Sequence, residues 1–196
     1  MTKSELRKIY LVRQKNLSSG ERNEKSRAIS ERFFDYFDVH KINFLHSFLP
    51  IKKFNEIDTR FIFEKIWRGF PRIETVVPRV DVESLEMESL IYKKETELAE
   101  NVWNIREPLH DEFVEADKID AVLIPLLCFD AQGFRIGYGK GFYDRFLKNC
   151  REDCLKIGLS YFAPVASIED KNKFDVTLNY SITPKRIYNF TPFQPE

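Results

Sequence analysis

The sequence predicts a single α/β domain, residues 1–196, with three layers: helices on both faces of a mostly parallel central sheet. Segments with helical patterns alternate along the chain with short apolar segments that are typical of strands. The run Asp120–Asp130 (DAVLIPLLCFD) is almost continuously apolar, as expected of a strand that is covered on both faces. No repeat and no low-complexity linker divides the chain, whose length suits one domain.

Helices are expected at four places. Thr2–Glu5 and Ser18–Glu21 each place a Ser or Thr three residues before a Glu, the capping-box pattern, so a helix should begin at each. A third helix should be capped by Asn55 and end at Gly69. The fourth should occupy about Gly141–Lys148.

Strands are expected between these helices. Beside Asp120–Asp130, a weakly alternating segment, Leu85–Tyr92, predicts an edge hairpin. The other expected strands are short apolar or β-branched segments: Ile42–Pro50, Ile73–Pro78, Leu155–Phe162, Val176–Ile182 and Arg186–Phe190. In a parallel sheet of this kind, ligands bind beyond the carboxyl ends of the strands.

Composition excludes several classes of protein. Lys plus Arg and Asp plus Glu number 31 each, so the global charge gives no attraction to nucleic acid or membrane. The sequence contains no apolar run of about 18 residues, so we expect no transmembrane helix. The polar start MTKSELRKIY lacks the apolar core of a signal peptide. Three cysteines, Cys128, Cys150 and Cys154, indicate reduced thiols rather than a disulfide framework. Reduced thiols indicate a cytoplasmic protein. We also expect a monomer.

The stretch Phe134–Leu147 (FRIGYGKGFYDRFL) concentrates both glycines and cations in a chain with only seven glycines. Glycines allow positive φ and a close approach of the backbone to a ligand, and successive amides in such a loop bind anions. The following helix adds its N-terminal dipole. These features predict a phosphate site; the alternative is a tight turn that serves only the fold. The glycines of the stretch Phe134–Leu147 are Gly137, Gly139 and Gly141, and its cations are Arg135, Lys140 and Arg145.

Three well-known motifs fit this stretch poorly. A P-loop requires Ser or Thr after the lysine, and Gly141 follows Lys140 instead. A dinucleotide fingerprint requires its third glycine one residue later than Gly141. From Lys140 the chain reads KGFYDRF, which lacks a small residue and an aromatic residue of the RNA-recognition pattern.

Gly137–Arg145 (GYGKGFYDR), preceded by a buried run that closes in Phe-Asp, resembles the signature of the 5-formyltetrahydrofolate cyclo-ligase family, also called methenyltetrahydrofolate synthetase. Shorter elements along nearly the whole chain resemble the family in the same order. They are KSELR at Lys3–Arg7, NEIDT around Glu56, WNIREP at Trp103–Pro108, PLLCFD at Pro125–Asp130 and KFD ending at Asp175.

The resemblance implies a fold related to ribose-phosphate isomerase and CoA-transferase domains. It also implies a reaction in which ATP and 5-formyltetrahydrofolate give 5,10-methenyltetrahydrofolate, ADP and phosphate. The N5-formyl group is an amide whose oxygen leaves poorly. Transfer of the γ-phosphate to that oxygen makes it a phosphate leaving group, and N10 can then close the ring.

The resemblance also implies where ATP and Mg²⁺ bind. Lys140 and Arg145 would be the catalytic cations, and Asp144 and Asp175 would hold Mg²⁺, which needs only one or two protein carboxylates. The alternative for Asp144 is a purely structural role, as a carboxylate in the first turn of a helix that the helix dipole favours. The residues assigned to ATP are Lys3, Arg7, Arg135, Ile136, Gly137, Tyr138, Gly139, Lys140, Gly141, Phe142 and Tyr143. For Lys3 and Arg7, which share one helix face, the alternative is an ordinary solvated surface.

The folate is assigned to a second group of residues. The carboxylate of Glu56 can accept two hydrogen bonds from the amino-pyrimidine edge of a pterin, although Glu56 could also be a plain first-turn helix residue. Trp103 could pack on a ring or simply belong to the core. The full set is Ile51, Glu56, Trp103, Tyr138 and Phe142.

Two rival functions remain open. Another ATP-using ligase or kinase on the same scaffold would keep the phosphate loop and change the pocket near Ile51 and Glu56. A non-catalytic nucleotide- or RNA-binding module is the second rival, and the balanced charge and the poor RNA-recognition match count against it.

Overall fold

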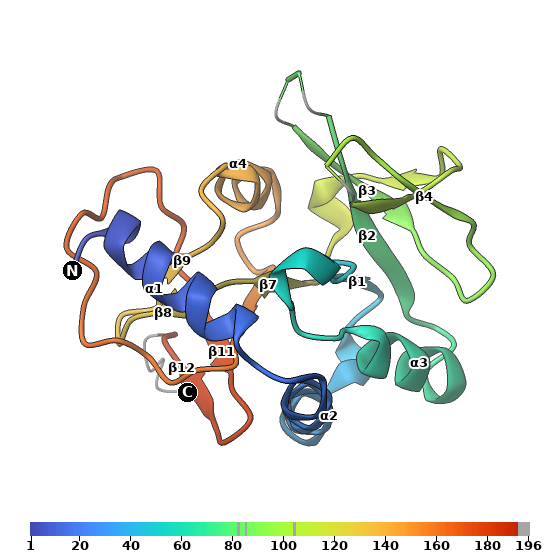
Figure 1. The fold of residues 1–196 in the computed structure, drawn as a ribbon. Helices are drawn as coiled ribbons and strands as arrows, with labels where there is room; N and C mark the ends of the chain where they lie inside the picture. Colours follow the sequence, from blue (N-terminus) through green and yellow to red (C-terminus); the bar gives the residue numbers. More distant parts are fainter. Residues whose placement is uncertain (82, 85, 104, 192–196) are drawn as a thin grey trace, which may run out of the picture.

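The computed structural model describes residues 1–81, 83–84, 86–103 and 105–191 (Figure 1). Its α-helices are α1 (Lys3–Lys15), α2 (Ser19–Tyr36), α3 (Arg60–Gly69) and α4 (Phe142–Asn149). Short 3₁₀ helices are η1 (Val39–Lys41), η2 (Lys52–Phe54) and η3 (Ala116–Lys118). The strands are β1 (Phe44–His46), β2 (Glu74–Val80), β3 (Met87–Ile91), β4 (Leu98–Glu100), β5 (Arg106–Pro108), β6 (Phe113–Val114), β7 (Ala121–Pro125), β8 (Cys128–Phe129), β9 (Arg135–Ile136), β10 (Leu155–Leu159), β11 (Tyr180–Ile182) and β12 (Ile187–Asn189).

An eight-stranded sheet forms the centre of the molecule, in the order β12-β11-β10-β7-β1-β2-β3-β6 (Figure 1). The strands from β11 to β2 in this order are parallel to their neighbours. At one edge β12 is antiparallel, and at the other edge β3 and β6 are antiparallel. The predicted mostly parallel central sheet is therefore confirmed.

Helices cover both faces of this sheet, as predicted. On one face Phe33 of α2 and Ile66 of α3 pack in the same buried cluster as Leu123 of β7. On the other face Leu147 of α4 packs with Ile124, the next residue of the same strand, because successive strand side chains point to opposite faces. No helix in the described part of the chain has the length and apolar character that a membrane crossing requires.

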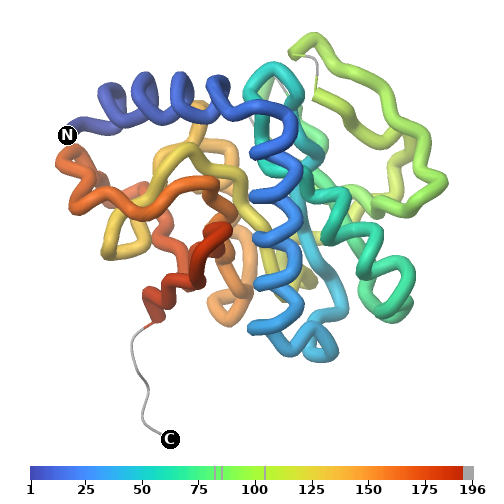
Figure 2. Tube along the Cα trace, turned by 60° about the horizontal axis from the view of Figure 1, so that its bottom comes forward, coloured from blue at the N-terminus to red at the C-terminus, as the bar shows by residue number. Residues whose placement is uncertain are grey.

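Helix α1 lies apart from the two helical layers. Its buried residues Leu6 and Tyr10 pack against Cys128 and Ile136 of the β8–β9 hairpin rather than against the central sheet. Figure 2 shows α1 at one side of the molecule, with the segment between β10 and β11 beside its first turn. Contacts of Lys3 with Asp170 and Asp175 join these two segments.

Both predicted capping boxes are present. The Thr2 hydroxyl accepts from the amide of Glu5, and the Glu5 carboxylate accepts from the Thr2 amide. Ser18 and Glu21 repeat the arrangement at the start of α2. Each box satisfies two of the amides that a helix N-terminus leaves without a partner, so the local sequence suffices to start these helices.

The predicted start of the third helix is wrong. Helix α3 begins at Arg60, with Thr59 at its N-cap, and Asn55 instead ends η2 in the left-handed conformation (φ 55°, ψ 41°). Asparagine tolerates this conformation, and its side-chain amide donates to the carbonyl of Lys15 at 2.9 Å. A contact with the end of α1 therefore overrides the capping signal.

The run Asp120–Asp130 is not one strand, although β7 occupies its first part. After Pro125, which has no amide to continue a ladder, the chain leaves the central sheet and forms β8, which pairs antiparallel with β9. The segment Leu85–Tyr92 supplies β3, which pairs with β2, but β6 covers its other side and takes the edge position. Leu85 itself lies outside the described residues.

The remaining predicted strands are present at shifted or shorter bounds. Ile42–Pro50 contributes only β1, and Leu155–Phe162 contributes β10, which ends at Leu159. The two C-terminal segments contribute β11 and β12, each of three residues. The predicted strands were too long because residues that flank the actual strands, such as Phe48 and Tyr161, are also apolar. They are buried in irregular segments rather than in the sheet.

The fully buried Asp130 organises the turn that leads into the glycine stretch. Its Oδ1 accepts from the amides of Gln132 and Phe134, at 3.0 and 3.1 Å. Its Oδ2 accepts from the amide of Ile168 at 3.2 Å and pairs with Lys171 at 2.9 Å. One carboxylate thus ties the β8–β9 turn to the segment that follows β10.

Replacing Asp130 by Asn should lower the free energy of unfolding by about 2 kcal/mol or more, because an NH₂ group would face buried donors. The matched control is Asp111→Asn, which removes the charge from an exposed ion pair with Arg79 and should cost less than about 1 kcal/mol. Urea unfolding of the three proteins measures both values. Equal, small losses would mean that the carboxylate does not hold the turn.

Candidate active site

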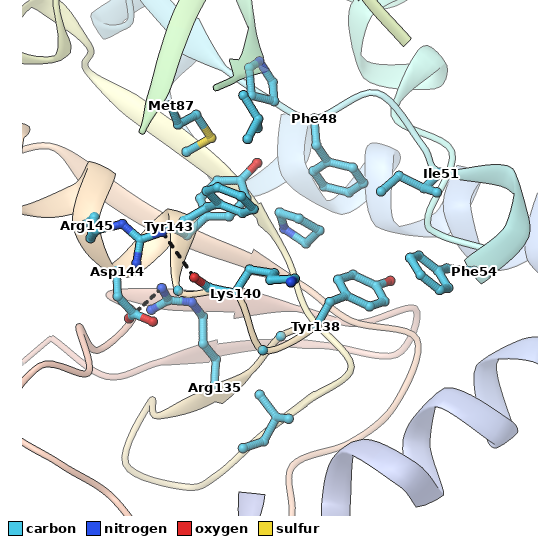
Figure 3. Close-up of a pocket in the computed structure, with 18 of the residues that line it drawn as sticks. Phe48, Ile51, Phe54, Met87, Arg135, Tyr138, Lys140, Tyr143, Asp144 and Arg145 are labelled. Carbon is cyan, nitrogen blue, oxygen red and sulfur yellow. Dashed lines mark hydrogen bonds and ion pairs between the residues drawn. The ribbon is translucent and has the colours of Figure 1, made fainter. Parts of the chain in front are cut away.

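A cavity of about 800 Å³ lies beyond the carboxyl ends of β1, β2 and β7 (Figure 3). The loop after β1 contributes Phe48 and Ile51, and the ends of β2 and β7 contribute Val80 and Pro125. The glycine stretch between β9 and α4 forms the opposite wall. The cavity therefore occupies the position at which sheets of this type bind ligands.

The residues predicted as site residues all line this one cavity, although they come from distant parts of the sequence. They are Lys3, Arg7, Ile51, Glu56, Trp103, Arg135, Ile136, Gly137, Tyr138, Gly139, Lys140, Gly141, Phe142, Tyr143, Asp144, Arg145 and Asp175. Their common location is a geometric fact, while the ligand assigned to each remains a prediction.

The glycine loop needs glycine at two of its three positions. Gly139 has φ of +99°, and Gly141, the N-cap of α4, has φ of +71°. Each also faces a guanidinium group, because an added Cβ would lie 3.3 Å from Arg7 Cζ and 3.1 Å from Arg145 Nη1, respectively. At Gly137 the expected positive φ is absent, and an added Cβ would meet nothing within 4 Å.

Arginines support this loop through its carbonyl groups. Arg7 Nε donates to the carbonyl of Gly137 at 3.0 Å. Arg145 Nη2 donates to the carbonyl of Lys140 at 3.1 Å, as Figure 3 shows. The Lys140 ammonium is exposed and lies 5.8 Å from the centroid of the Trp103 ring. The loop therefore combines oriented amides, a helix N-terminus and several cations, which is the chemistry of an anion site.

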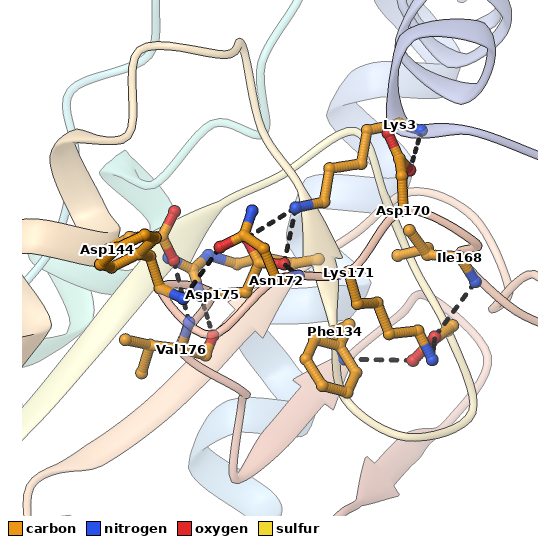
Figure 4. Close-up of polar contacts among 12 residues, drawn as sticks. Lys3, Phe134, Asp144, Ile168, Asp170, Lys171, Asn172, Asp175 and Val176 are labelled. Atoms are coloured by element: carbon orange, nitrogen blue, oxygen red, sulfur yellow. Dashed lines mark hydrogen bonds and ion pairs between the residues drawn. The ribbon is translucent and has the colours of Figure 1, made fainter.

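The two predicted metal-binding carboxylates each have a cationic partner (Figure 4). Asp144 Oδ1 lies 2.8 Å from Arg135 Nη2 and accepts from the amide of Val176 at 3.1 Å. Arg135 also donates to the carbonyl of Val176. Both oxygens of Asp175 lie within 2.7 Å of Lys3 Nζ, and its Oδ2 accepts from the amide of Asn172.

Arg135 is the most deeply buried cation of the site, with its side chain 6% exposed. Burial lowers the pKa of its guanidinium, and the charge of Asp144 opposes that effect. A buried cation of this kind is strongly unfavourable without its partner. The pair also links β9, the first turn of α4 and the segment before β11.

The opposite end of the cavity contains a buried carboxyl group. Glu56 is 6% exposed, and its Oε2 accepts from the amide of Ile51 at 2.7 Å. Its Oε1 has no hydrogen-bond partner among the described residues. Burial raises the pKa of Glu56 to about 7, although the Ile51 amide and the Tyr138 hydroxyl act to lower it. Such an unpartnered buried oxygen is suited to a ligand that brings donors.

Aromatic and apolar side chains enclose this end. The Phe54 ring stacks on Tyr138 at 4.6 Å between centroids, and Trp103 lies 6.0 Å from Phe142. Such walls suit a flat ring system. Sequence reasoning did not assign several lining residues, which are Phe48, Leu49, Lys53, Phe54, Pro78, Val80, Met87, Ile105, Arg106, Pro125, Lys148, Asn172 and Phe174.

Part of this missed set carried a usable signal. Lys53 and Phe54 lie between Ile51 and Glu56, two residues that the sequence already assigned to the site, so the whole loop could have been included. Met87 and Ile105 carried no such signal. Met87 begins β3 and Ile105 directly precedes β5, so their position at the cavity depends on how these strands pair.

Fold and cavity together define an α/β protein whose cavity has the chemistry of an anion site at one end and a buried carboxyl group among aromatic rings at the other. A model of the 5-formyltetrahydrofolate cyclo-ligase family matches residues 1–177. The 5-formyltetrahydrofolate cyclo-ligase of Mycoplasma pneumoniae is 31% identical over 165 residues, which cover 82% of this chain and 86% of that protein. The Escherichia coli enzyme of the same name is 25% identical over 181 residues, covering 91% of this chain and 98% of its own.

A solved structure agrees with these relatives. The NMR structure of Aquifex aeolicus 5,10-methenyltetrahydrofolate synthetase aligns with a TM-score of 0.83 and 28% identity, covering 100% of this chain and 96% of that one. The synthetase of Mycoplasma pneumoniae aligns with a TM-score of 0.74 and 28% identity, covering 94% and 99%. The chain belongs to the 5-formyltetrahydrofolate cyclo-ligase family, and it is a ligase.

Replacing Asp144 by Ala should lower the free energy of unfolding by about 3 kcal/mol, because Arg135 would remain buried without its charged partner. Asp175→Ala should cost less, since Lys3 can reach water more easily than Arg135. Urea unfolding of both variants, without ligands, measures the difference. An Asp144 variant as stable as the parent would show that the ion pair does not stabilise the loop.

Proposed function

We propose that the protein catalyses the ATP-dependent cyclisation of 5-formyltetrahydrofolate to 5,10-methenyltetrahydrofolate, with release of ADP and phosphate. One observation carries the proposal within this family: a single cavity joins a loop with the chemistry of a phosphate site to a buried carboxyl group among aromatic rings. The reaction needs both ends close together, because the γ-phosphate must reach the formyl oxygen.

The glycine loop would hold the triphosphate. Amides of the segment 137–141 and the N-terminus of α4 would receive its oxygens, as glycine loops before helices do. Lys140 and Arg145 would act as the catalytic cations that neutralise charge on the transferring group. Lys3 and Arg7 would close the site from α1, and Lys3 would exchange Asp175 for a phosphate oxygen.

Glu56 would recognise the pterin ring. Its ionised carboxylate offers Oε1 and Oε2 to the amino group and ring N–H of the pterin, replacing the missing partner of Oε1. Ile51, Trp103, Tyr138 and Phe142 would enclose the rings and exclude water. Exclusion of water matters because the phosphorylated formyl group would otherwise hydrolyse.

The chemistry then needs positioning more than covalent participation of the protein. The formyl oxygen attacks the γ-phosphorus, and the bond from that phosphorus to the bridging oxygen of ADP breaks. N10 next attacks the formyl carbon, phosphate leaves with the former formyl oxygen, and N10 loses its proton. Holding the acceptor oxygen in line with the γ-phosphate is the principal contribution of the cavity.

Mg²⁺ fits the carboxylates that line the cavity. Asp144 would contact the ion, and Asp175 would be a second carboxylate once Lys3 leaves it. Among the described residues no cluster of three or more His, Cys, Asp or Glu side chains could bind a metal alone. This donor set suits Mg²⁺, which keeps several waters and takes its other oxygens from phosphates. When bound, the ion would neutralise charge on the β- and γ-phosphates.

Mixing the protein with 5-formyltetrahydrofolate, ATP and Mg²⁺ should produce a new long-wavelength absorption band and one ADP per folate converted. The band arises because the methenyl carbon joins N5 and N10 in an extended conjugated system. Near-ultraviolet spectroscopy and an ADP assay follow the two signals, and omission of either substrate should abolish both.

The outcome separates the rival functions. ADP without the band would indicate a kinase-like activity on the same scaffold. ATP binding with neither signal would indicate a non-catalytic module. Either result would overturn the proposed cyclisation.

Binding of 5-formyltetrahydrofolate, measured without ATP, should weaken as the pH falls below about 7. Glu56 has a raised pKa of about 7, so it is ionised above that pH, and only the ionised form accepts two hydrogen bonds from the pterin. Affinity should then fall about tenfold per pH unit in the acidic range. The Glu56→Gln variant should bind weakly at every pH, with almost no pH dependence between 6 and 8, roughly one unit either side of that pKa. A variant that keeps the parental profile would remove Glu56 from the folate site.

A further inference from the structure

Phe174 is an exposed aromatic residue that the proposed reaction does not use. It is 60% exposed, yet it lines the same cavity as the glycine loop. Single apolar residues on a plain surface need no explanation, whereas an exposed ring in the wall of a cavity offers a contact to a ligand. Phe174 also directly precedes Asp175, one of the two carboxylates assigned to Mg²⁺.

The segment 174–176 runs along α4, the helix that follows the glycine loop. The amide of Val176 donates to Asp144 Oδ1 at 3.1 Å. Lys148, one helical turn after Asp144, places its Nζ 4.9 Å from the centroid of the Phe174 ring. The ring therefore lies beside the same helix whose N-terminus is assigned to the phosphates.

Hydrogen bonds fix the turn that presents this ring. Asn172 Oδ1 accepts from the amide of Phe174 at 2.8 Å, and the amide of Asn172 donates to Asp175 Oδ2 at 2.8 Å. Lys3 binds the same segment, because its amide donates to Asp170 Oδ1 and its ammonium pairs with Asp175 (Figure 4). The main chain at Phe174 is thus held in place before a ligand arrives.

Two lysines contact the Phe174 ring. Lys148 Nζ lies 4.9 Å and Lys173 Nζ lies 5.2 Å from its centroid, and both lysines are exposed. Contacts of exposed lysines with a ring are weak, and these long side chains move easily. A flat ring can therefore take the place of one lysine on the Phe174 face, while the positive charge stays close to the phosphates.

The cations and amides of the site account for the phosphates of a nucleotide but not for its base. Phe54 and Tyr138 lie at one side of the cavity, and Asp144 and Arg145 lie at the other (Figure 3). Because the γ-phosphate must face the folate, the base has to extend toward the side of Asp144. Phe174 is an exposed aromatic ring on that side, and stacking on such a ring binds a base without reading its edge.

We propose that Phe174 is the residue on which the purine base of the nucleotide stacks. The proposal rests on the proposed use of ATP, and it assigns the base to a residue that neither the motif resemblance nor the glycine loop indicated. The turn 172–175 would then serve both parts of the nucleotide, with Phe174 at the base and Asp175 at the phosphate end.

The test compares the binding of ATP with that of inorganic tripolyphosphate, which has the phosphate chain but no nucleoside. Isothermal titration calorimetry measures both dissociation constants without folate, at one fixed Mg²⁺ concentration. In Phe174→Ala the dissociation constant for ATP should rise about tenfold or more, as expected for the loss of one base–aromatic stack. The constant for tripolyphosphate should stay at the parental value, which also shows that the variant folds.

Phe113→Ala is the matched control. Phe113 on β6 is 61% exposed, almost the same as Phe174, and it is not among the described residues that line the cavity. Its replacement should change neither dissociation constant.

Phe174→Trp provides a second variant, because it keeps an aromatic face for the base. It should bind ATP at least as tightly as the parent. Parental affinity for ATP in Phe174→Ala overturns the proposal. So does an equal weakening of both ligands in Phe174→Ala, or a Phe174→Trp variant that binds ATP as weakly as Phe174→Ala.

The same measurements distinguish the failure of this inference from the failure of the proposed function. If the parent binds ATP more tightly than tripolyphosphate and Phe174→Ala keeps that difference, the inference alone fails. It also fails alone if the parent binds the two ligands equally well, since the base then contributes nothing. If the parent binds no ATP, the proposed function fails, and the inference fails with it.

Discussion

A partly buried ion pair holds the glycine loop at both of its ends. Arg135 lies before the loop on β9 and Asp144 lies after it on α4, so their contact at 2.8 Å holds the two ends of the loop together. Both partners also bind Val176, which brings the segment before β11 to the same point. Burying the charge of Arg135 is costly, and an ion pair with a buried partner adds little net stability over apolar residues. The pair instead fixes the position of the loop. Any arrangement of the loop that separated Arg135 from Asp144 would leave the buried guanidinium unpaired, which is strongly unfavourable.

Helix α1 is the second constraint, since it touches both ends of the cavity. Lys3 pairs with Asp175 at one end, Arg7 donates to Gly137 in the middle, and Gln14 reaches Tyr138 at the other end. These side chains lie on one side of a rigid rod that rises about 1.5 Å per residue. The helix therefore fixes the distance between the cationic end and the carboxyl end. A phosphoryl transfer between two bound molecules requires this kind of fixed separation.

The two ends of the cavity differ in how their polar groups are satisfied. At the loop end, charged groups pair with one another, as Arg135 does with Asp144 and Lys3 with Asp175. At the other end, Glu56 Oε1 and the Tyr143 hydroxyl are buried without a partner among the described residues. Buried polar atoms without partners are costly, and native proteins retain few of them. Glu56 and Tyr143 line the cavity, so their unpartnered atoms suit a ligand that brings its own donors and acceptors.

The sequence by itself determined the features that depend on neighbours in the chain. Capping boxes at Thr2 and Ser18 start two helices because their partners lie three residues away, and the apolar runs that formed β7 and β10 predicted the mostly parallel sheet. Motif resemblance also located part of the residues that line the cavity, those of the glycine stretch above all. Only the tertiary structure decided which cation each carboxylate meets, that Asn55 ends a turn rather than starting a helix, and that Gln14 faces Tyr138. Contacts such as those of Lys3, Arg7 and Gln14 join residues 124 to 172 positions apart, and no local periodicity carries information about partners at that distance.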